Sequence, residues 1–401
     1  MKKYIYFLAL ALLAASCVYP YDYVPDSSVD NIVIEGDILL GEESYFQVSK
    51  VQALDSPYNE RKVIKARVIV EGDNGYTKEG EGRIEGNEYV NVVDLTDIRY
   101  EPGQASASYR LRVVLDNALV NSPSGAEKKE YVSEWIRPEG DLVLDNLSYA
   151  VDRGKEELAI RMSLHSGGAS KHFRYSYEED WEFTTYNRAS TYYQMPDNAH
   201  PNGQVLDFGA SANTYYCWKH AVSRGINLAT TEDMSEDRLV DYPFKFFKPN
   251  DQKLSIMYRI DLTVYPVSEG SYKYYENLKS ISSYTGDLFS PIPSAMKGNL
   301  SCTTDPGETV YGYIAVVFPK KAILYVSDED ADFYKMGKNP YEFQEEVVDS
   351  FDYLKRYLQG WRPYYHDFLK GQIWGYPAEC LDCTKLGGTK NKPADWPTSH
   401  I

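Results

Sequence analysis

Cys17 is the residue whose chemistry is clearest from its neighbours, because three small residues precede it. The chain opens with Met1-Lys2-Lys3, continues as an apolar run from Tyr4 to Leu13, and reaches Ala14-Ala15-Ser16 before the cysteine. A charged start, an apolar middle and small residues at a cleavage point make an export signal. This apolar run is shorter than the roughly 20 residues of a membrane-spanning helix. We expect residues 1–16 to be removed as a lipoprotein signal peptide. An ordinary secretory signal with an incidental cysteine is the alternative.

Acylation of the Cys17 thiol would tether the mature chain to a membrane. Acyl chains contribute about 0.8 kcal/mol per buried methylene, so two or three chains hold a protein on a bilayer almost permanently. We therefore expect Cys17 to be the lipidation site. Residues 17–30, rich in Tyr, Pro and Asp, would then form an extended tether, and the rest of the chain would lie outside the cytoplasm.

Four further cysteines form an even set, which indicates disulfides in an oxidising compartment. We expect a long-range bridge between Cys217 and Cys302 and a local bridge between Cys380 and Cys383. The Cys-x-x-Cys spacing of the second pair is also that of a redox motif or of half a metal site. Structural bridging is the preferred interpretation, because no second Cys or His pair stands at zinc spacing and no thioredoxin-like βαβ pattern surrounds the motif.

No motif in the sequence predicts a catalytic or metal centre. The six histidines include no pair at the i, i+4 spacing that places two imidazoles on one helix face; they are His165, His172, His200, His220, His366 and His400. The sequence also lacks a Gly-x-Ser-x-Gly elbow, a phosphate-binding Gly loop and a dinucleotide fingerprint. We therefore predict a protein that is not an enzyme, with no catalytic residues, no metal and no cofactor.

Two acidic runs could do chemistry if folding brought their carboxylates together. Glu178-Glu179-Asp180 could supply the pair that glycoside hydrolysis needs, roughly 5–9.5 Å apart, but neighbours in a strand point to opposite faces. The run from Asp328 to Asp332 alternates carboxylates that Ca²⁺ could bind. An EF-type loop would need Gly where Phe333 stands, so we expect a solvated loop instead.

Composition limits the partners of the chain. The formal charge is −17, and it becomes −19 once Lys2 and Lys3 leave with the signal. This sign argues against nucleic acid and against direct adhesion to anionic lipid headgroups. Tyr occurs 37 times, against 14 Phe and 6 Trp. Because Tyr buries a ring while keeping a hydroxyl, it suits both β-sheets with a wet face and binding surfaces.

Short alternating segments separated by Gly, Asn and Asp turns predict the elements that must position these residues. We expect a first domain at 31–137, with strands at 31–40, 45–51, 66–72, 89–93, 109–115 and 131–135. Strands of this length and spacing are typical of an immunoglobulin-like antiparallel β-sandwich.

A larger β-rich domain is expected at 138–342, with strands at 142–151, 158–164, 173–177, 181–183, 254–260 and 310–318. Ser268 is an N-cap candidate for a helix near 269–284, in which aromatic and aliphatic residues recur at near-helical spacing. Residues 343–401 should form a C-terminal cap, with a helix at 343–358 followed by an irregular segment that the Cys380–Cys383 bridge pins. The predicted fold is therefore mainly β with a few inserted helices.

An ordered set of short motifs resembles one family of Bacteroidota lipoproteins, domain of unknown function 4249. The motifs run along nearly the whole mature chain: Ile32 to Gly36, Cys217-Trp218, Leu254-Ser255 with Tyr258, Ser268 to Tyr275, Gly286 to Phe289 with Pro291 and Pro293, Gly298-Asn299, Gly312-Tyr313, Cys380 to Cys383, Gly387-Gly388, Lys392-Pro393 and Trp396. The resemblance implies an outer-membrane lipoprotein, exposed on the cell surface, whose gene often lies beside that of a TonB-dependent, SusC-like transporter.

The resemblance thus implies a non-enzymatic binding or lid subunit of a nutrient importer, with a TonB-dependent barrel as partner. Because the family's ligand is unknown, it implies no binding residues. A structural or adhesive surface protein is the alternative; internal repeats would have favoured it, and the sequence has none. An unrecognised hydrolase is the third possibility.

Overall fold

The computed structural model of the chain consists mainly of β-strands, which confirms the predicted fold class. It describes residues 31–51, 63–86, 88–100, 107–116, 128–140, 142–167, 170–207, 214–283, 298–330, 339–342, 344–349 and 352–397. The predicted signal peptide at 1–16, the lipidation site Cys17 and the tether at 17–30 lie outside these residues. Among the helices that are described, none is long and apolar enough to cross a membrane.

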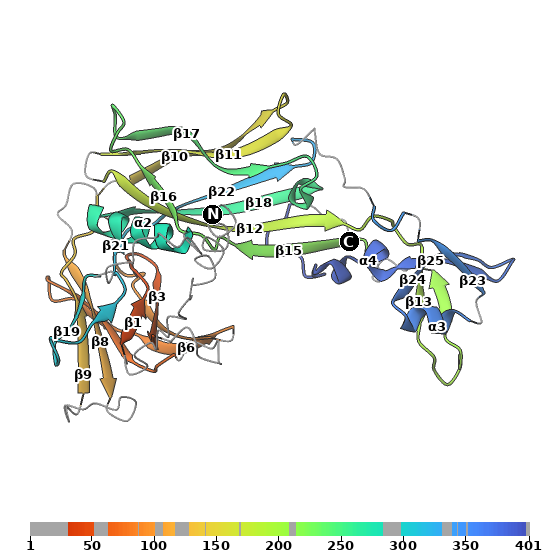
Figure 1. Ribbon diagram of the computed structural model, residues 1–401, viewed down its shortest axis with the longest axis horizontal. Helices are drawn as coiled ribbons and strands as arrows, with labels where there is room; N and C mark the ends of the chain where they lie inside the picture. The colour runs from red at the N-terminus through yellow and green to blue at the C-terminus, as the bar shows by residue number, and fades with distance from the viewer. Residues whose placement is uncertain are drawn as a thin grey trace, which may run out of the picture.

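Two facing sheets form the centre of the molecule (Figure 1). One sheet has the order β10-β11-β17 and the other the order β15-β12-β18-β22, with β16 also paired to β12. Side chains such as Ile160, Phe183 and Ile260 are fully buried between them. The strands are β10 Leu142–Asp152, β11 Glu157–Ser166, β12 His172–Thr184, β15 Tyr216–Val222, β16 Asn227–Thr230, β17 Arg238–Phe247, β18 Met257–Val267 and β22 Lys320–Ser327.

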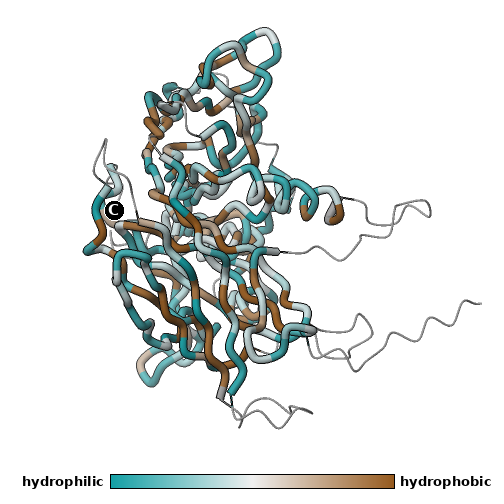
Figure 2. The backbone as a smooth tube through the Cα atoms, turned by 90° about the vertical axis from the view of Figure 1, so that its left-hand side faces the viewer, coloured by the Kyte–Doolittle hydropathy of each residue, from teal (hydrophilic) through white to brown (hydrophobic). Residues whose placement is uncertain are grey.

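β12 shows how the sequence builds this central sandwich. Phe173, Tyr175 and Phe183 are buried between the two sheets, whereas Arg174 and Asp180 occupy the alternate positions and lie on the other face. Figure 2 shows hydrophobic and hydrophilic stretches succeeding one another along the backbone. The period-two pattern at 173–177 and 181–183 therefore predicted strand here, and the structure joins the two segments in one strand.

The first β-unit, at one end of the sandwich, consists of two five-stranded sheets around a separate apolar core. Their orders are β20-β1-β3-β7-β6 and β19-β9-β8-β4-β5, and a short β2–β21 pair accompanies them. The strands are β1 Ile32–Glu35, β2 Ile38–Leu39, β3 Glu43–Lys50, β4 Arg67–Gly72, β5 Thr77–Glu79, β6 Glu81–Glu85, β7 Glu88–Asp94, β8 Tyr109–Asp116, β9 Lys128–Ser133, β19 Leu300–Cys302, β20 Val310–Tyr311 and β21 Val316–Val317.

A later part of the chain returns to complete this first unit. Val310 pairs in parallel with Ile32, and Val316 pairs in parallel with Ile38, so the run 310–318 does not belong to the central sandwich as we expected. Gly312 makes this return possible: its φ is +124°, and a Cβ there would overlap the carbonyl oxygen of Ile34. Parallel pairing between distant segments leaves no local pattern, which is why the sequence did not predict it.

The helix α2 (Glu269–Ser283) covers one end of the outer face of the β12 sheet, and it begins as predicted. The hydroxyl of Ser268 accepts a hydrogen bond from the backbone N–H of Ser271 at 3.3 Å, which caps the helix. Beside it, Arg174 forms an ion pair with Asp37 of the first unit and stacks on Tyr275 of the helix, 4.6 Å from the ring centroid. This cluster joins the first unit, the helix and the sandwich.

A C-terminal unit lies at the other end of the sandwich (Figure 1). It combines a β13–β14 hairpin with a three-stranded sheet of order β23-β25-β24 and two short helices. The elements are β13 Thr191–Gln194, β14 Gln204–Asp207, β23 Glu346–Asp349, α3 Tyr353–Leu358, β24 Trp361–Asp367, β25 Gln372–Pro377, α4 Ala378–Leu381 and the 3-10 turn η4 Cys383–Leu386. A further 3-10 turn, η3 (Gln252–Leu254), precedes β18.

Two predictions for the C-terminal region were wrong. Of the helix expected at 343–358, the described residues show only α3, because Val347 and Val348 enter a strand opposite Trp374 and Ile373. The segment after Gly360, expected to be irregular, forms the β24–β25 hairpin. The acidic start and basic end of this segment favoured a helix. Its β-branched residues favour a strand, and pairing with β25 makes 346–349 a strand.

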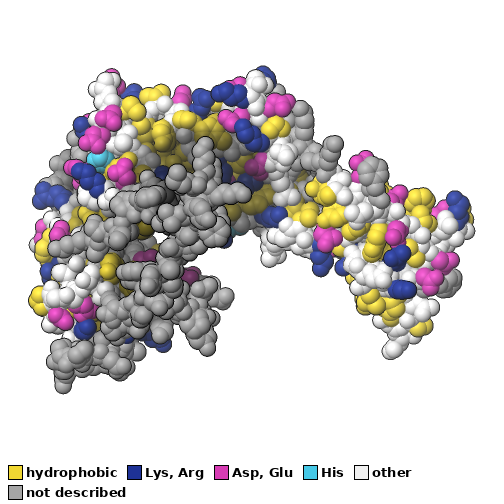
Figure 3. Space-filling model, in the orientation of Figure 1, with side chains coloured by type: hydrophobic (Ala, Val, Ile, Leu, Met, Phe, Trp, Pro, Cys, Tyr) yellow, Lys and Arg dark blue, Asp and Glu magenta, His cyan; other side chains and the backbone are white. Residues whose placement is uncertain are grey.

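The two end units and the sandwich together give the molecule an arched shape, with an open hollow under the sandwich (Figure 3). The outer face of the β12 sheet carries Arg174 at the end next to the first unit. At the other end, the indole nitrogen of Trp396 donates a hydrogen bond to the buried carboxylate of Glu182 at 2.8 Å. Between them, the same face carries ion pairs of Asp180 with His220 and of Arg259 with Asp261.

Candidate functional site

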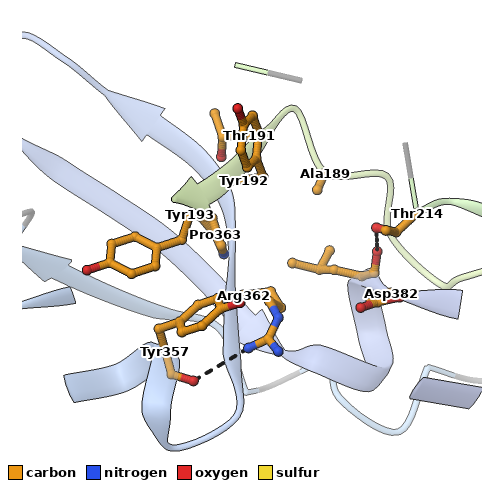
Figure 4. Close-up of a pocket in the computed structure, with 10 residues that line it drawn as sticks. Ala189, Thr191, Tyr192, Tyr193, Thr214, Tyr357, Arg362, Pro363 and Asp382 are labelled. Carbon is orange, nitrogen blue, oxygen red and sulfur yellow. Dashed lines mark hydrogen bonds between the residues drawn. The ribbon is translucent and has the colours of Figure 1, made fainter. Parts of the chain in front are cut away.

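A pocket of about 230 Å³ lies where the C-terminal unit joins the rest of the chain (Figure 4). Its walls come from β13, from the end of α3 and the start of β24, and from α4 with the residue that follows it. The residues lining it are Ala189, Thr191, Tyr192, Tyr193, Thr214, Tyr357, Arg362, Pro363, Leu381 and Asp382. It therefore combines three tyrosines with one arginine and one aspartate.

Arg362 supplies the positive charge of the pocket. Its Nη1 donates to the carbonyl oxygens of Trp361 at 2.8 Å and Tyr357 at 3.5 Å, and its guanidinium stacks 4.1 Å from the centroid of the Tyr357 ring. Figure 4 shows the bond to the Tyr357 carbonyl and the ring beside the guanidinium. Neither Nε nor Nη2 forms a hydrogen bond or ion pair with a described residue. The arginine is thus held in place while one edge of it stays available to a ligand.

The hydroxyl groups around the pocket differ in what they already bind. Tyr193 donates to the carbonyl oxygen of Asn202 at 2.5 Å, and Thr214 donates to the carbonyl oxygen of Leu381 at 3.1 Å. The hydroxyl of Thr191 is buried, with the residue only 2% exposed, and has no hydrogen-bond partner among the described residues. A buried hydroxyl without a partner costs free energy, so Thr191 adds nothing to the polar contacts that the pocket offers.

Asp382 supplies the negative charge and is held by the turn that follows it. One of its carboxylate oxygens accepts from the backbone N–H of Thr384 at 3.0 Å and from the Thr384 hydroxyl at 2.6 Å. The neighbouring Cys383 is bonded to Cys217 of β15, with the two Cα atoms 5.7 Å apart. The disulfide therefore ties this wall of the pocket to the central sandwich.

This bridge contradicts the predicted cysteine pairing. The structure joins Cys217 to Cys383, whereas Cys302 and Cys380 are free and buried. Cys302 lies in β19 of the first unit, which places it in a different core from Cys217. Cys380 lies in α4 and packs beside Tyr376 and Leu381, where burial raises the pKa of its thiol. The even number of cysteines and their spacing in the sequence do not show which cysteines lie close together in the folded chain.

The acidic run 178–180 does not gather into a catalytic pair. Glu178 is exposed, Glu179 is buried inside the sandwich, and Asp180 lies on the opposite face from Glu179 with its carboxylate 2.9 Å from His220. The Glu179 carboxylate receives hydrogen bonds from Lys253 at 2.7 Å and from the Tyr258 hydroxyl at 2.7 Å.

Lys245 also lies 3.1 Å from Glu179. Burial alone would raise the pKa of Glu179, but the hydrogen bonds and the two lysine charges lower it below the usual value. Glu179 thus lies in a charged cluster that holds the two sheets together, since Lys245 belongs to one sheet and Tyr258 to the other.

The other metal and acid candidates remain apart within the part of the chain that is described. Asp330 accepts a hydrogen bond from the Tyr149 hydroxyl at 2.6 Å and caps the turn at Ser327, while Asp332 and Phe333 lie outside the described residues. Three of the histidines, His165, His200 and His220, each contact a single aspartate; His400 lies outside the described residues. Within the described ranges, no three or more metal-binding side chains gather in one place.

Sequence reasoning did not find the pocket residues, because they come from four separate places in the chain. Tyr192 and Tyr193 precede Tyr357 and Arg362 by more than 150 residues. The only signal was the surplus of tyrosine, which fits a binding surface as well as a sheet. No residue of the pocket stands in a motif that carries chemistry by itself.

Comparison with protein-family models identifies the family of the chain. The model described as Domain of unknown function (DUF4249) matches residues 18–322. The chain belongs to this family. The match confirms the resemblance to this family over 18–322, whereas the motifs from Cys380 to Trp396 lie beyond it. It includes β13 of the pocket but ends before α3, β24 and α4. A comparison with curated proteins gave no match.

Proposed function

We propose that this DUF4249 protein is an outer-membrane lipoprotein, anchored through Cys17 and exposed on the cell surface, that acts as a non-enzymatic binding or lid subunit of a TonB-dependent importer. The lipoprotein signal at 1–16 supports the anchor. The pocket around Arg362 is the observation that carries the binding role. Its apolar walls with a few fixed polar groups are the composition that small-molecule sites share.

The bonding of the acidic side chains supports binding over hydrolysis. A glycoside hydrolase needs two carboxyl groups facing one substrate, one of them with a raised pKa. Glu179 instead has a lowered pKa and contacts Lys245 and Lys253, and Asp180 faces the other side of the sheet. These carboxylates therefore have a structural role.

An exposed apolar turn supports docking onto a partner protein. Phe368 is 62% exposed and Leu369 is 99% exposed at the tip of the β24–β25 hairpin. The turn is well defined, because one Asp367 carboxylate oxygen accepts from the backbone N–H groups of Leu369 at 3.1 Å and Lys370 at 3.2 Å. A fixed Phe-Leu pair in water gains free energy when a partner covers it.

The test is purification of the tagged protein from detergent-extracted native outer membrane, followed by mass spectrometry of what accompanies it. A TonB-dependent barrel in stoichiometric amount is the expected result. The Phe368→Ser/Leu369→Ser double variant should lose the barrel, and the control Ile84→Ser, which changes an exposed residue of the first unit, should keep it. A lipoprotein that purifies alone in all three forms would contradict the importer role and favour adhesion.

A further inference from the structure

The free edge of Arg362 indicates which chemical group the pocket receives. Nη1 is occupied by two backbone carbonyls, and Nε–H and Nη2–H have no partner among the described residues, so they remain as two parallel donors. Two parallel donors match the two oxygens of a carboxylate, which is the pairing in which arginine exceeds lysine. Stacking on Tyr357 keeps the guanidinium plane fixed, so little side-chain entropy is lost when a ligand binds.

The charges of the pocket favour a carboxylate over a phosphate. The residues that line it include one cation, Arg362, and one anion, Asp382. A phosphate dianion would need more positive charge than one guanidinium and would be repelled by Asp382. A carboxylate carries a single charge, and Asp382 can accept a hydrogen bond from an amide N–H of the same ligand.

The size and walls of the pocket favour one end of a chain-like ligand over a complete small molecule. Its volume of about 230 Å³ is below the roughly 300–1,000 Å³ typical of sites for complete small molecules. Tyr192, Tyr193 and Leu381 provide an apolar enclosure for one side chain.

We propose that the pocket binds the C-terminal residue of a peptide, with Arg362 paired to the terminal carboxylate and the tyrosines around the last side chain. This inference rests on the proposed binding function and names its ligand class. The captured nutrient would then be a short peptide with a free C-terminus.

Calorimetric titration of the detergent-solubilised mature lipoprotein tests this, with the tripeptide Gly-Ala-Phe as a free acid and as its C-terminal amide. The free acid should bind roughly tenfold or more tightly than the amide, since a charged bidentate pair is lost with the carboxylate. Arg362→Lys keeps the positive charge but removes the two parallel N–H donors, and it should weaken binding of the free acid by a similar factor. The control Arg356→Lys, on α3 and paired with Glu346, should bind as the wild type does.

Equal affinity for the acid and the amide in the wild type would overturn the proposal without relying on any variant. Unchanged affinity in a folded Arg362→Lys protein would overturn it as well. Binding of a neutral disaccharide that Tyr357→Ala abolishes and Arg362→Lys does not would replace the peptide with a sugar, while the binding role stood. Purification with the barrel is a separate measurement. Failure of the peptide-binding proposal can therefore be distinguished from failure of the importer role.

Discussion

Removal of the Cys217–Cys383 disulfide should destabilise the protein strongly and loosen the pocket. The two cysteines are separated by 166 positions, so the bridge closes a long loop in the unfolded chain. In the chain-entropy model a loop of this length gives about 5 kcal/mol of stabilisation, which is an upper estimate. At about 2–4 °C per kcal/mol for a large cooperative unit, Cys217→Ala should lower the melting temperature by roughly 10 °C.

Calorimetry of the wild type and of three variants measures this effect. Cys383→Ala should lower the melting temperature as much as Cys217→Ala, and the double variant should lower it no further, because both single changes remove the same bond. Cys302→Ala is the matched control: it removes a buried thiol that forms no disulfide, so its effect should be much smaller. Peptide mapping of the unreduced protein should show the Cys217–Cys383 cross-link.

Two results would refute the reasoning. A Cys217–Cys302 or Cys380–Cys383 cross-link in the mapped peptides would show that the chain pairs as its sequence spacing predicted. Equal melting temperatures for Cys217→Ala and Cys302→Ala would show that the bridge does not constrain the unfolded chain. If the disulfide holds the wall formed by Leu381 and Asp382, reduction should also weaken ligand binding before the protein unfolds.

Three further predictions concern the charged clusters and the anchor. Glu179→Gln leaves two lysines without their carboxylate and should cost about 3 kcal/mol of unfolding free energy at neutral pH in a urea titration. Since the folded-state pKa of Glu179 lies below 4.5, wild-type stability should fall as pH drops below about 4.5, and Glu179→Gln should flatten that fall; a parallel pH curve would contradict the role. Arg174→Met leaves the largely buried Asp37, whose side chain is 10% exposed, without its counter-charge and should cost about 3 kcal/mol, whereas Arg83→Ala, at an exposed pair, should leave the melting temperature nearly unchanged. Cys17→Ala should abolish radioactive palmitate labelling and move the protein from the membrane to the soluble fraction; labelling that persists would exclude this lipidation site.

The strands were predictable where neighbours along the chain determine them. In the segment 109–115 apolar residues occupy every second position, and it forms β8 with Leu111, Val113 and Leu115 fully buried. The α2 helix was predictable for the same reason, since Ser268 caps it and local spacing defines it. Local signals determine these elements, so tertiary contacts only had to agree with them.

The features that the sequence did not predict all depend on contacts between distant segments. Val310 pairs with Ile32 in the sheet of the first unit, and Val347 lies in a strand because it pairs with β25. The cysteine partners follow from which core each cysteine enters, as Cys302 shows. The pocket has the same origin, because its walls come from segments that lie far apart in the sequence.

Photocrosslinking in living cells tests the proposed importer role most directly. A photoreactive amino acid in place of Leu369, at the exposed tip of the β24–β25 hairpin, samples whatever protein touches this turn. The same label in place of Ile84, exposed on the first unit, is the control. The importer role predicts a cross-link from position 369 to a TonB-dependent barrel that is absent or weaker from position 84. No barrel cross-link from position 369, or equal cross-links from both positions, would contradict docking through this turn.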